Sequence, residues 1–305
     1  MHDIIVIGGS AGGVQALQVL TAALPLDLQA SLFVTLHIGN GYDGMSHLAE
    51  ILNRVTRVTA KFPPDGETIE RGKIYIAPPD HHLLVAEGHI HLSHGPKENH
   101  HRPAINPLFR SAATVYGSRV IGVVLTGMLD DGTAGLAEIK RRGGVAVVQD
   151  PSDAMFPSMP ANAIRYVEAD HVLPLKEIAP LLARLALTRR VAVVREEPME
   201  TTKTAITCPE CRGPLWQEKQ GEIVEFRCRV GHTYSPLSLA QEHDETLERT
   251  LWSTMVTLEE AADIDDCLVP ELGEEIATRA KRRREQAGVI KAMLEEDEIA
   301  KKPGL

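Results

Sequence analysis

The chain has 305 residues, enough for one large domain and a smaller appended one. Its formal net charge of −10 arises entirely after Arg195, because residues 1–195 carry equal numbers of basic and acidic side chains. An acidic surface repels phosphate groups, so this charge argues against nucleic acid as a partner. No apolar run approaches the roughly 20 residues that cross a bilayer, and the N-terminus lacks the basic segment of a signal peptide.

The N-terminal part of the chain has the pattern of a parallel α/β sheet. A buried strand over Ile4–Ile7 is followed by a glycine turn, an amphipathic helix and a second strand over Ala30–Leu36. Later strands are expected at Lys73–Ala77, Leu83–Val85, His89–Leu92, Val120–Leu125 and Val145–Val148, with helices at Thr133–Arg141 and Leu181–Leu187. We therefore predict one doubly wound, mostly parallel α/β domain over residues 1–190.

Three further segments follow this domain. Residues 191–204 include the charged, proline-containing stretch REEPMETTKT and are expected to form a linker. Residues 205–236 form a compact cysteine module. Residues 237–300 carry two apolar stripes with helical spacing, separated by Pro270 and Gly273, which predicts a helical hairpin.

A serine stands on the glycine turn after the first strand. Residues 8–12, GGSAG, satisfy the pattern G-x-S-x-G, in which small neighbours expose the serine and the next backbone N–H groups can face an oxyanion. A nucleotide-binding turn is one alternative, but Ser10 occupies the place of the second glycine in that fingerprint. His37 also stands where an acidic ribose ligand is expected. The other alternative is a serine that only caps the following helix.

Two more candidate residues follow buried strands. His37 comes directly after the second strand, and Asp130 and Asp131 come after the strand IGVVLTGM. Each alone would be interpreted as structural, the aspartates as a helix cap. Together, the three strand ends bring a hydroxyl, an imidazole and a carboxylate to one edge of the sheet, as nucleophilic catalysis requires. Their order along the chain differs from the Ser-Asp-His order of α/β-hydrolases.

Six ordered segments carry a specific resemblance. IGGSAGG, VTLHI, YIAPPDHHL, HRPAINPLF, VLTGMLDDG and FPSMPANAI resemble the catalytic domain of chemotaxis protein-glutamate methylesterases over residues 1–190. The resemblance implies a triad of Ser10, His37 and Asp131, with Asp131 preferred over Asp130. It also implies that the backbone of Met128 and the turn at Ala11 form the oxyanion site. Arg102 either contacts the substrate or braces its loop.

The resemblance implies hydrolysis of glutamyl methyl esters on a chemoreceptor or a similar signalling protein, without a catalytic cofactor. Glutamine deamidation at the same kind of site is a related activity of the family. Ala11 stands where the family often has threonine, and Leu129 where it often has glycine. No receiver domain is expected, because Ser10 lies so near the start of the chain. The alternatives are a non-catalytic signalling adaptor and an esterase for another methylated protein.

The cysteine module has the spacing of a metal site. Cys208 and Cys211 form C-x₂-C, and Cys228 and His232 form C-x₃-H after an intervening hairpin. Two such pairs suit a structural, tetrahedral Zn²⁺ with no open coordination position, as in a zinc ribbon. The alternative is a reduced thiol pair on a small hairpin. Cys267 has no partner motif. Because disulfide frameworks are typical of short secreted domains, we expect a cytoplasmic protein.

The C-terminal helical hairpin is acidic apart from the run Lys281–Arg284. Its apolar stripes are expected to form the core between the two helices. Docking of a partner or self-association through these helices is the alternative. The resemblance to extensions of some stand-alone methylesterase homologues does not identify a function for this part of the chain.

Overall fold

The computed structural model describes residues 3–37, 47–188 and 197–301. The chain divides into two compact units, Met1–Leu239 and Ala240–Leu305. The part of the expected linker before residue 197 lies outside the described residues.

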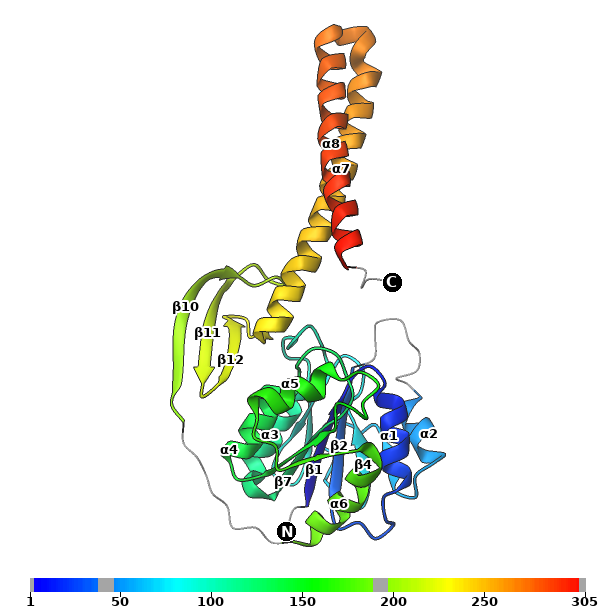
Figure 1. Ribbon diagram of the computed structural model, residues 1–305, viewed down its shortest axis with the longest axis vertical. Coiled ribbons are helices and arrows are strands. Elements are labelled where there is room, and N and C mark those ends of the chain that lie inside the picture. The colour runs from blue at the N-terminus through cyan, green and yellow to red at the C-terminus, as the bar shows by residue number, and fades with distance from the viewer. Residues whose placement is uncertain (1–2, 38–46, 189–196, 302–305) are drawn as a thin grey trace. The chain divides into compact units, whose positions relative to one another are not determined.

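The first unit contains a seven-stranded sheet in the order β3-β4-β2-β1-β7-β8-β9 (Figure 1). Every neighbouring pair of these strands is parallel. The strands are β1 (Ile4–Gly9), β2 (Ser31–Leu36), β3 (Thr59–Lys61), β4 (Lys73–Ile76), β7 (Val120–Val124), β8 (Val145–Gln149) and β9 (His171–Leu173). A separate antiparallel pair is formed by β5 (His82–Val85) and β6 (Ile90–Ser93). The expected α/β class with a mostly parallel sheet is confirmed.

Helices cover both faces of this sheet (Figure 1). One face packs against α1 (Gly13–Ala22), α2 (Leu48–Asn53) and α6 (Leu175–Leu187). The other packs against α3 (Ile105–Tyr116), α4 (Thr133–Arg141) and α5 (Ser158–Tyr166). Alternate residues of β1 point to opposite sides, so Ile5 and Ile7 enter one core while Ile4 and Val6 enter the other. Burial on both faces explains why the strands are continuously apolar.

The strand order places a topological switch beside β1. The chain passes from β1 to β2 on one side and later returns to β7 on the other. In open parallel sheets, ligands bind in the crevice at the carboxyl ends of strands around such a point. The residues directly after β1, β2 and β7 are therefore the ones that the fold brings together.

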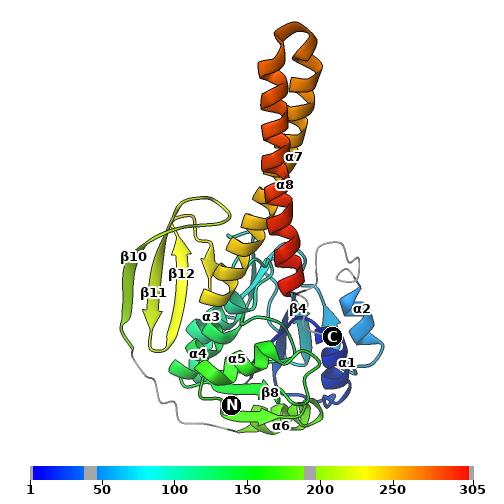
Figure 2. The ribbon, with the colours of Figure 1, turned by 45° about the horizontal axis from the view of Figure 1, so that its top comes forward.

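The cysteine module forms a four-stranded antiparallel sheet, β10-β11-β12-β13. Its strands are β10 (Met199–Thr207), β11 (Pro214–Gln220), β12 (Ile223–Cys228) and β13 (Thr233–Tyr234), and the first three lie side by side in Figure 2. This corrects the predicted linker, because residues 199–204 belong to a strand paired with β11. The side chains of β10 are exposed along almost its whole length. The sequence therefore lacks the alternation of apolar and polar residues by which a strand is predicted.

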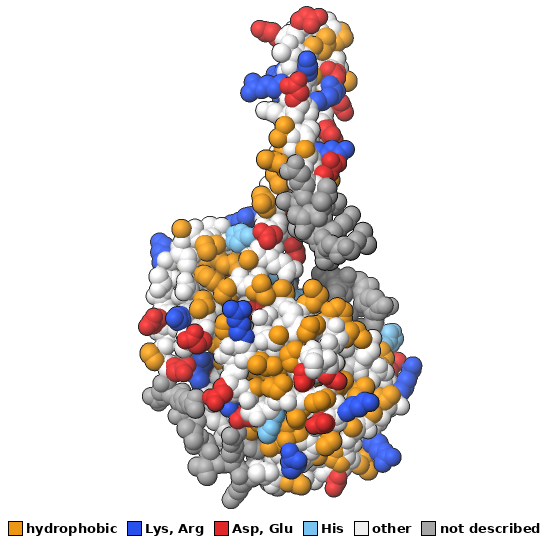
Figure 3. All heavy atoms as spheres, viewed as in Figure 1, with side chains coloured by type: hydrophobic (Ala, Val, Ile, Leu, Met, Phe, Trp, Pro, Cys, Tyr) orange, Lys and Arg blue, Asp and Glu red, His pale blue; other side chains and the backbone are white. Residues whose placement is uncertain are grey.

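The second unit is a pair of long helices. They are α7 (Pro236–Leu272), of which the part from Ala240 belongs to this unit, and α8 (Glu274–Lys301). Gly273 joins them with a positive φ of 81°, whereas Pro270 lies inside α7. Buried residues between the helices are Met255, Ala262, Ala280, Ala287 and Leu294. Acidic and basic side chains are interspersed over the visible face (Figure 3). No described helix is long and apolar enough to span a membrane.

Candidate active site

Ser10 lies on the turn between β1 and α1, at the switch point of the sheet. Its N–H donates to the carbonyl of Thr126 at 3.0 Å, and its carbonyl accepts from the N–H of Gly13 at 2.8 Å. Gly12 provides the left-handed N-cap of α1 with φ of 75°, and no side chain caps that helix end. The interpretation of Ser10 as a helix cap is therefore wrong. The side chain of Ser10 is partly exposed and can serve another function.

The backbone after β7 approaches Ser10 closely. A Cβ atom added at Gly127 would lie 2.8 Å from the Cβ of Ser10, and only glycine avoids that contact. The Thr126 hydroxyl donates to the carbonyl of Ala11 at 3.1 Å and accepts from the N–H of Phe156 at 2.8 Å. Three loops that follow different strands are thereby tied together around the serine.

His37 lies beside Ser10 because their strands are neighbours in register. Gly9 pairs with Leu36, so the next residue of each strand, Ser10 or His37, emerges at the same level of the sheet edge. The N–H of His37 donates to the carbonyl of Gly9 at 3.1 Å, which continues the ladder. Its side chain is 5% exposed, and its Nε2 lies 2.8 Å from Oδ2 of Asp131.

Asp131 is buried at the N-terminus of α3. Its Oδ2 accepts from the N–H of Ile105 at 2.6 Å, and its Oδ1 accepts from the N–H of Asn106 at 3.3 Å and from Nδ2 of Asn99 at 3.1 Å. Burial by itself would raise the pKa of Asp131, but the contact with His37, its charge and the Ile105 N–H outweigh burial. The pKa therefore lies below its ordinary value, and the side chain is a carboxylate facing His37.

The neighbouring Asp130 points elsewhere. Its Oδ1 accepts from the hydroxyl of Ser235 at 2.6 Å and from that of Ser238 at 3.4 Å. Burial raises the pKa of Asp130, partly offset by the Ser235 hydrogen bond. The two aspartates thus have separate partners, and of the two only Asp131 contacts His37.

The remaining candidates from the sequence lie around this centre. Met128 is in the loop after β7 and has an exposed side chain. Arg102 binds Oδ1 of Asp80 through Nε and Nη2, and its Nη1 donates to the carbonyls of His94 and Gly95. These contacts match the loop-bracing interpretation of Arg102.

Three residues near the centre were not singled out from the sequence. The ring of His101 stacks on that of His37, with centroids 3.7 Å apart, and Asn99 binds Asp131. Asn106 binds Asp131 through its N–H, while its own Oδ1 accepts from Gly132 and Gly135 at the start of α4. All three lie in the segment ENHHRPAIN, whose later part carried the resemblance, but no spacing rule identifies their partners.

The four predicted metal ligands come together in the module. Atoms of Cys208, Cys211, Cys228 and His232 all lie within 4.8 Å of one another. The Sγ atoms of Cys211 and Cys228 are 3.6 Å apart, and Nδ1 of His232 is 3.5 Å from Sγ of Cys228. Tetrahedral Zn²⁺ with bonds of about 2.3 Å places sulfur ligands roughly 3.8 Å apart. The arrangement is therefore suited to holding a metal ion.

Comparison with known proteins identifies relatives of the sheet domain. The family model for CheB methylesterase matches residues 5–182. A Leptospira interrogans relative, provisionally named as a protein-glutamate methylesterase/protein-glutamine glutaminase, is 40% identical over 60% of this chain and 95% of its own length. A Methanosarcina mazei protein with that enzyme name is 36% identical, and the match covers 61% of this chain but 52% of the relative. The crystal structure of the Thermotoga maritima CheB methylesterase catalytic domain superposes with a TM-score of 0.57 at 35% identity, covering 61% of this chain and 99% of that one.

Proposed function

Because the chain belongs to the CheB methylesterase family, we propose that it hydrolyses glutamate methyl esters on chemoreceptors or similar signalling proteins. The observation that carries the proposal is the contact of His37 with Asp131, 2.8 Å apart, together with the strand register that brings Ser10 and His37 to the same level of the sheet edge. Family membership supports the substrate class. The three side chains supply the nucleophile, the base and the group that orients the base.

The proposed mechanism is a two-step acyl transfer. Ser10 Oγ attacks the ester carbonyl while His37 takes its proton. Since Nε2 of His37 faces Asp131, Nδ1 is the nitrogen available to Ser10. His37 then protonates the departing methoxide, and methanol leaves an acyl-serine. A water molecule, deprotonated by the same imidazole, hydrolyses that intermediate and restores Ser10. Asp131 remains ionised and stabilises the imidazolium.

The negative charge that develops on the carbonyl oxygen needs donors near Ser10. We assign this role to the backbone N–H groups of Ala11 and Met128. Ala11 directly follows the nucleophile, and Met128 follows Gly127, whose backbone packs against Ser10. Arg102 is assigned to bracing the loop at the rim, because Asp80 and two carbonyls already bind its guanidinium.

The same residues can deamidate glutamine. Attack on a side-chain amide gives the same acyl-serine, with ammonia leaving in place of methanol. An amide has a poorer leaving group, so protonation of the departing nitrogen by His37 matters more for this substrate. The relatives' shared name, which couples methylesterase with glutaminase, supports this second activity.

The cysteine module is assigned a structural Zn²⁺ held by Cys208, Cys211, Cys228 and His232, as in a zinc ribbon. Four protein ligands complete its coordination, so no catalytic step passes through the metal. Cys208, Cys211 and Cys228 form no disulfide bond, which leaves their sulfur atoms available to a metal and fits the reducing cytoplasm as the place of action.

Release of methanol tests the activity. Purified protein is incubated with membranes that carry radiolabelled methylated chemoreceptors, and the volatile label is counted. Wild-type protein should release methanol, whereas Ser10→Ala should be slower by at least roughly a thousandfold. Equal release by both proteins would overturn the assignment of Ser10. No release by wild-type protein that still reacts with serine-directed phosphonates would overturn the substrate class.

A further inference from the structure

The cysteine module contacts the loop that precedes α3. The N–H of Asn99 donates to the carbonyl of Thr233 at 2.8 Å, and the N–H of Ser235 donates to Oδ1 of Asn99 at 2.8 Å. The amide Nδ2 of Asn99 then donates to Oδ1 of Asp131 at 3.1 Å. Asn99 is 2% exposed, so one buried side chain joins the module to the carboxylate of the proposed triad.

A second contact reaches the adjacent aspartate. The hydroxyls of Ser235 and Ser238 both donate to Oδ1 of Asp130. Both carboxylates of the Asp130-Asp131 turn are therefore contacted by the segment 233–238, Asp131 through Asn99 and Asp130 directly. A segment that is distant in sequence thus orients the turn after β7.

The segment 233–238 begins at the metal cluster. Thr233 directly follows His232, and the Tyr234 hydroxyl lies 3.6 Å from Sγ of Cys208. The pairing of Phe226 with Tyr234 and of Arg227 with Thr233 holds β13 against β12. Bonds from a metal to His232 and Cys208 would fix the position of the carbonyl that Asn99 binds.

Asn99 also has a backbone that needs external support. Its φ is 47°, in the left-handed region that costs a non-glycine residue free energy, although asparagine tolerates it best. The hydrogen bonds with Thr233 and Ser235 hold this conformation. By donating to Oδ1, the amide leaves Oδ2 of Asp131 for His37 and for the N–H of Ile105.

We propose that Asn99 is a positioning residue for Asp131 and that the metal-bound cysteine module keeps Asn99 in place. The module is then a part of the active site that orients the triad from outside the sheet. This inference rests on the proposed function, in which Asp131 orients His37. It predicts that loss of the metal disturbs the pair Asp131–His37, although the metal touches neither residue.

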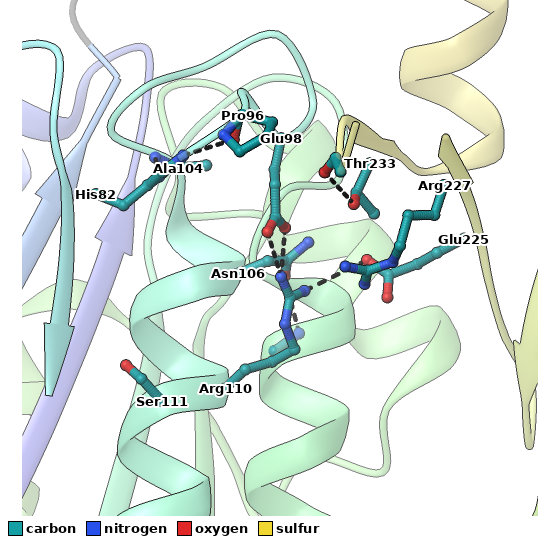
Figure 4. Close-up of polar contacts among 12 residues, drawn as sticks. His82, Pro96, Glu98, Ala104, Asn106, Arg110, Ser111, Glu225, Arg227 and Thr233 are labelled. Carbon is teal, nitrogen blue, oxygen red and sulfur yellow. Dashed lines mark hydrogen bonds and ion pairs between the residues drawn. The ribbon is translucent and has the colours of Figure 1, made fainter. Parts of the chain in front are cut away.

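Other contacts join the module to the sheet domain without involving Asp131. They serve as controls, because they only hold the two parts together. Arg110 of α3 binds Glu98 and, at 3.5 Å, Glu225 of β12 (Figure 4). Lys97 binds Glu210, next to a metal ligand, at 3.3 Å. These ion pairs help the two parts adhere but make no contact with Asp131.

The test compares Asn99→Gly with the control Lys97→Ala in the full chain. Glycine adopts the left-handed conformation freely, so the first variant removes the amide without backbone strain. We expect kcat for methyl ester hydrolysis to fall roughly 10- to 100-fold with KM nearly unchanged, as for a lost hydrogen bond to a charged group. Lys97→Ala should keep the wild-type kcat. A wild-type kcat in Asn99→Gly would overturn the proposal.

Metal removal gives the second arm. Treatment of the wild-type protein with a chelator should lower kcat, and added Zn²⁺ should restore it. The same treatment should lower kcat of Asn99→Gly by a smaller factor, because the connection through the Asn99 side chain is already absent and only the contacts with Asp130 remain. Equal fractional losses in both proteins would show that the metal acts by another route and would overturn the coupling.

A spectroscopic arm separates this inference from the methylesterase assignment. The ring N–H proton of His37 that faces Asp131 is followed by NMR in the wild-type protein. Its resonance should shift or broaden in Asn99→Gly and on metal removal, but not in Lys97→Ala. This readout needs no turnover, so a protein that hydrolyses no receptor ester can still support or overturn the coupling. An unchanged resonance in Asn99→Gly would overturn it.

Discussion

At the scale of single residues, Asp131 both caps a helix and faces His37. Its carboxylate caps α3, with Oδ2 accepting from the N–H of Ile105 and Oδ1 from that of Asn106, and the same Oδ2 also faces His37. The positive end of the helix and the histidine both favour the ionised form. A helix cap and a member of the proposed triad are thus one side chain, because the first turn of α3 lies beside the loop that follows β7.

Replacing Asp131 with asparagine should separate these roles. The amide oxygen of Asp131→Asn can still accept from one helix N–H, but the negative charge opposite His37 is lost. We expect kcat to fall by roughly 10³- to 10⁴-fold, as in other triads that lose this charge. Kinetics of methanol release measure the effect. Asp27→Asn, at an exposed position in the loop before β2, is the control and should retain wild-type kcat.

His101 should make the stability of the protein sensitive to pH. Burial, followed by the charge of the stacked His37, lowers the pKa of His101 from 6.5 to about 3. Between these values the unfolded chain binds the proton and the folded chain does not. The free energy of unfolding should therefore fall as the pH drops below 6.5, by up to about 1.4 kcal/mol per pH unit from this group.

The variant His101→Gln isolates that contribution. Denaturant unfolding is measured between pH 6.5 and about pH 5.5, above the range in which most carboxylates titrate. The variant should show a shallower fall in unfolding free energy than the wild type, whatever its stability at neutral pH. The same slope in both proteins would contradict the shifted pKa. The exposed His89→Gln should keep the wild-type slope.

At the scale of elements, α3 contacts the sheet, α4 and the cysteine module. Its N-terminus receives Asp131, and Asn106 in its first turn caps α4 in return. Gly8 of β1 permits this close packing, since a Cβ there would lie 2.4 Å from the side chain of Ile105. One turn further along, Arg110 binds Glu98 from the preceding loop and Glu225 from the module. The helix thus connects the sheet, the proposed triad and the module.

Replacing Arg110 should weaken the attachment of α3 to the preceding loop and to the module. Arg110 lies between two carboxylates of low exposure, and burial raises the pKa of Glu225. Arg110→Met leaves the carboxylates without their common partner, so we expect the free energy of unfolding to fall by about 3 kcal/mol. Chemical denaturation measures the loss. Arg284→Met, at exposed ion pairs with Asp263 and Asp266, should cost less than about 1 kcal/mol.

At the scale of the whole molecule, the cysteine module and the sheet domain belong to one compact unit. The module's small hydrophobic cluster contains Cys208, Leu215, Cys228, Tyr234 and Leu239. Two of its five buried members, Cys208 and Cys228, are predicted metal ligands, so little apolar area remains to stabilise the module by itself. Modules of this size commonly depend on their metal for folding.

Loss of one ligand should therefore lower the melting temperature of the first unit. Cys211→Ser removes an exposed predicted ligand of the cluster without creating a cavity in the core. We expect Tm to fall by at least roughly 4 °C, and the variant to lose its response to added Zn²⁺. Cys267→Ser, at an exposed cysteine of α7 outside the cluster, is the matched control. Equal Tm values for the two variants would contradict a structural metal.

The sequence alone was enough to predict the features that local patterns encode. Alternating and continuous apolar runs predicted the parallel sheet, and the short spacings of Cys208, Cys211, Cys228 and His232 predicted a cluster that the structure brings together. The prediction that Ser10, His37 and Asp131 lie at one edge of the sheet followed from the rule that parallel strands deliver their carboxyl ends to one edge. Such features depend on residues close in sequence or on one topological rule.

Only the tertiary structure decided which distant residues meet. Asn99 binds Ser235, which lies 136 positions away, and no periodicity encodes a contact of that kind. The strand β10 was missed because its exposed side chains carry no burial signal. Likewise, only the structure shows that Asp130 binds Ser235 and Ser238 whereas Asp131 faces His37. Hydrophobic patterning specifies the faces that are buried, whereas directional hydrogen bonds across the fold determine how the site is oriented.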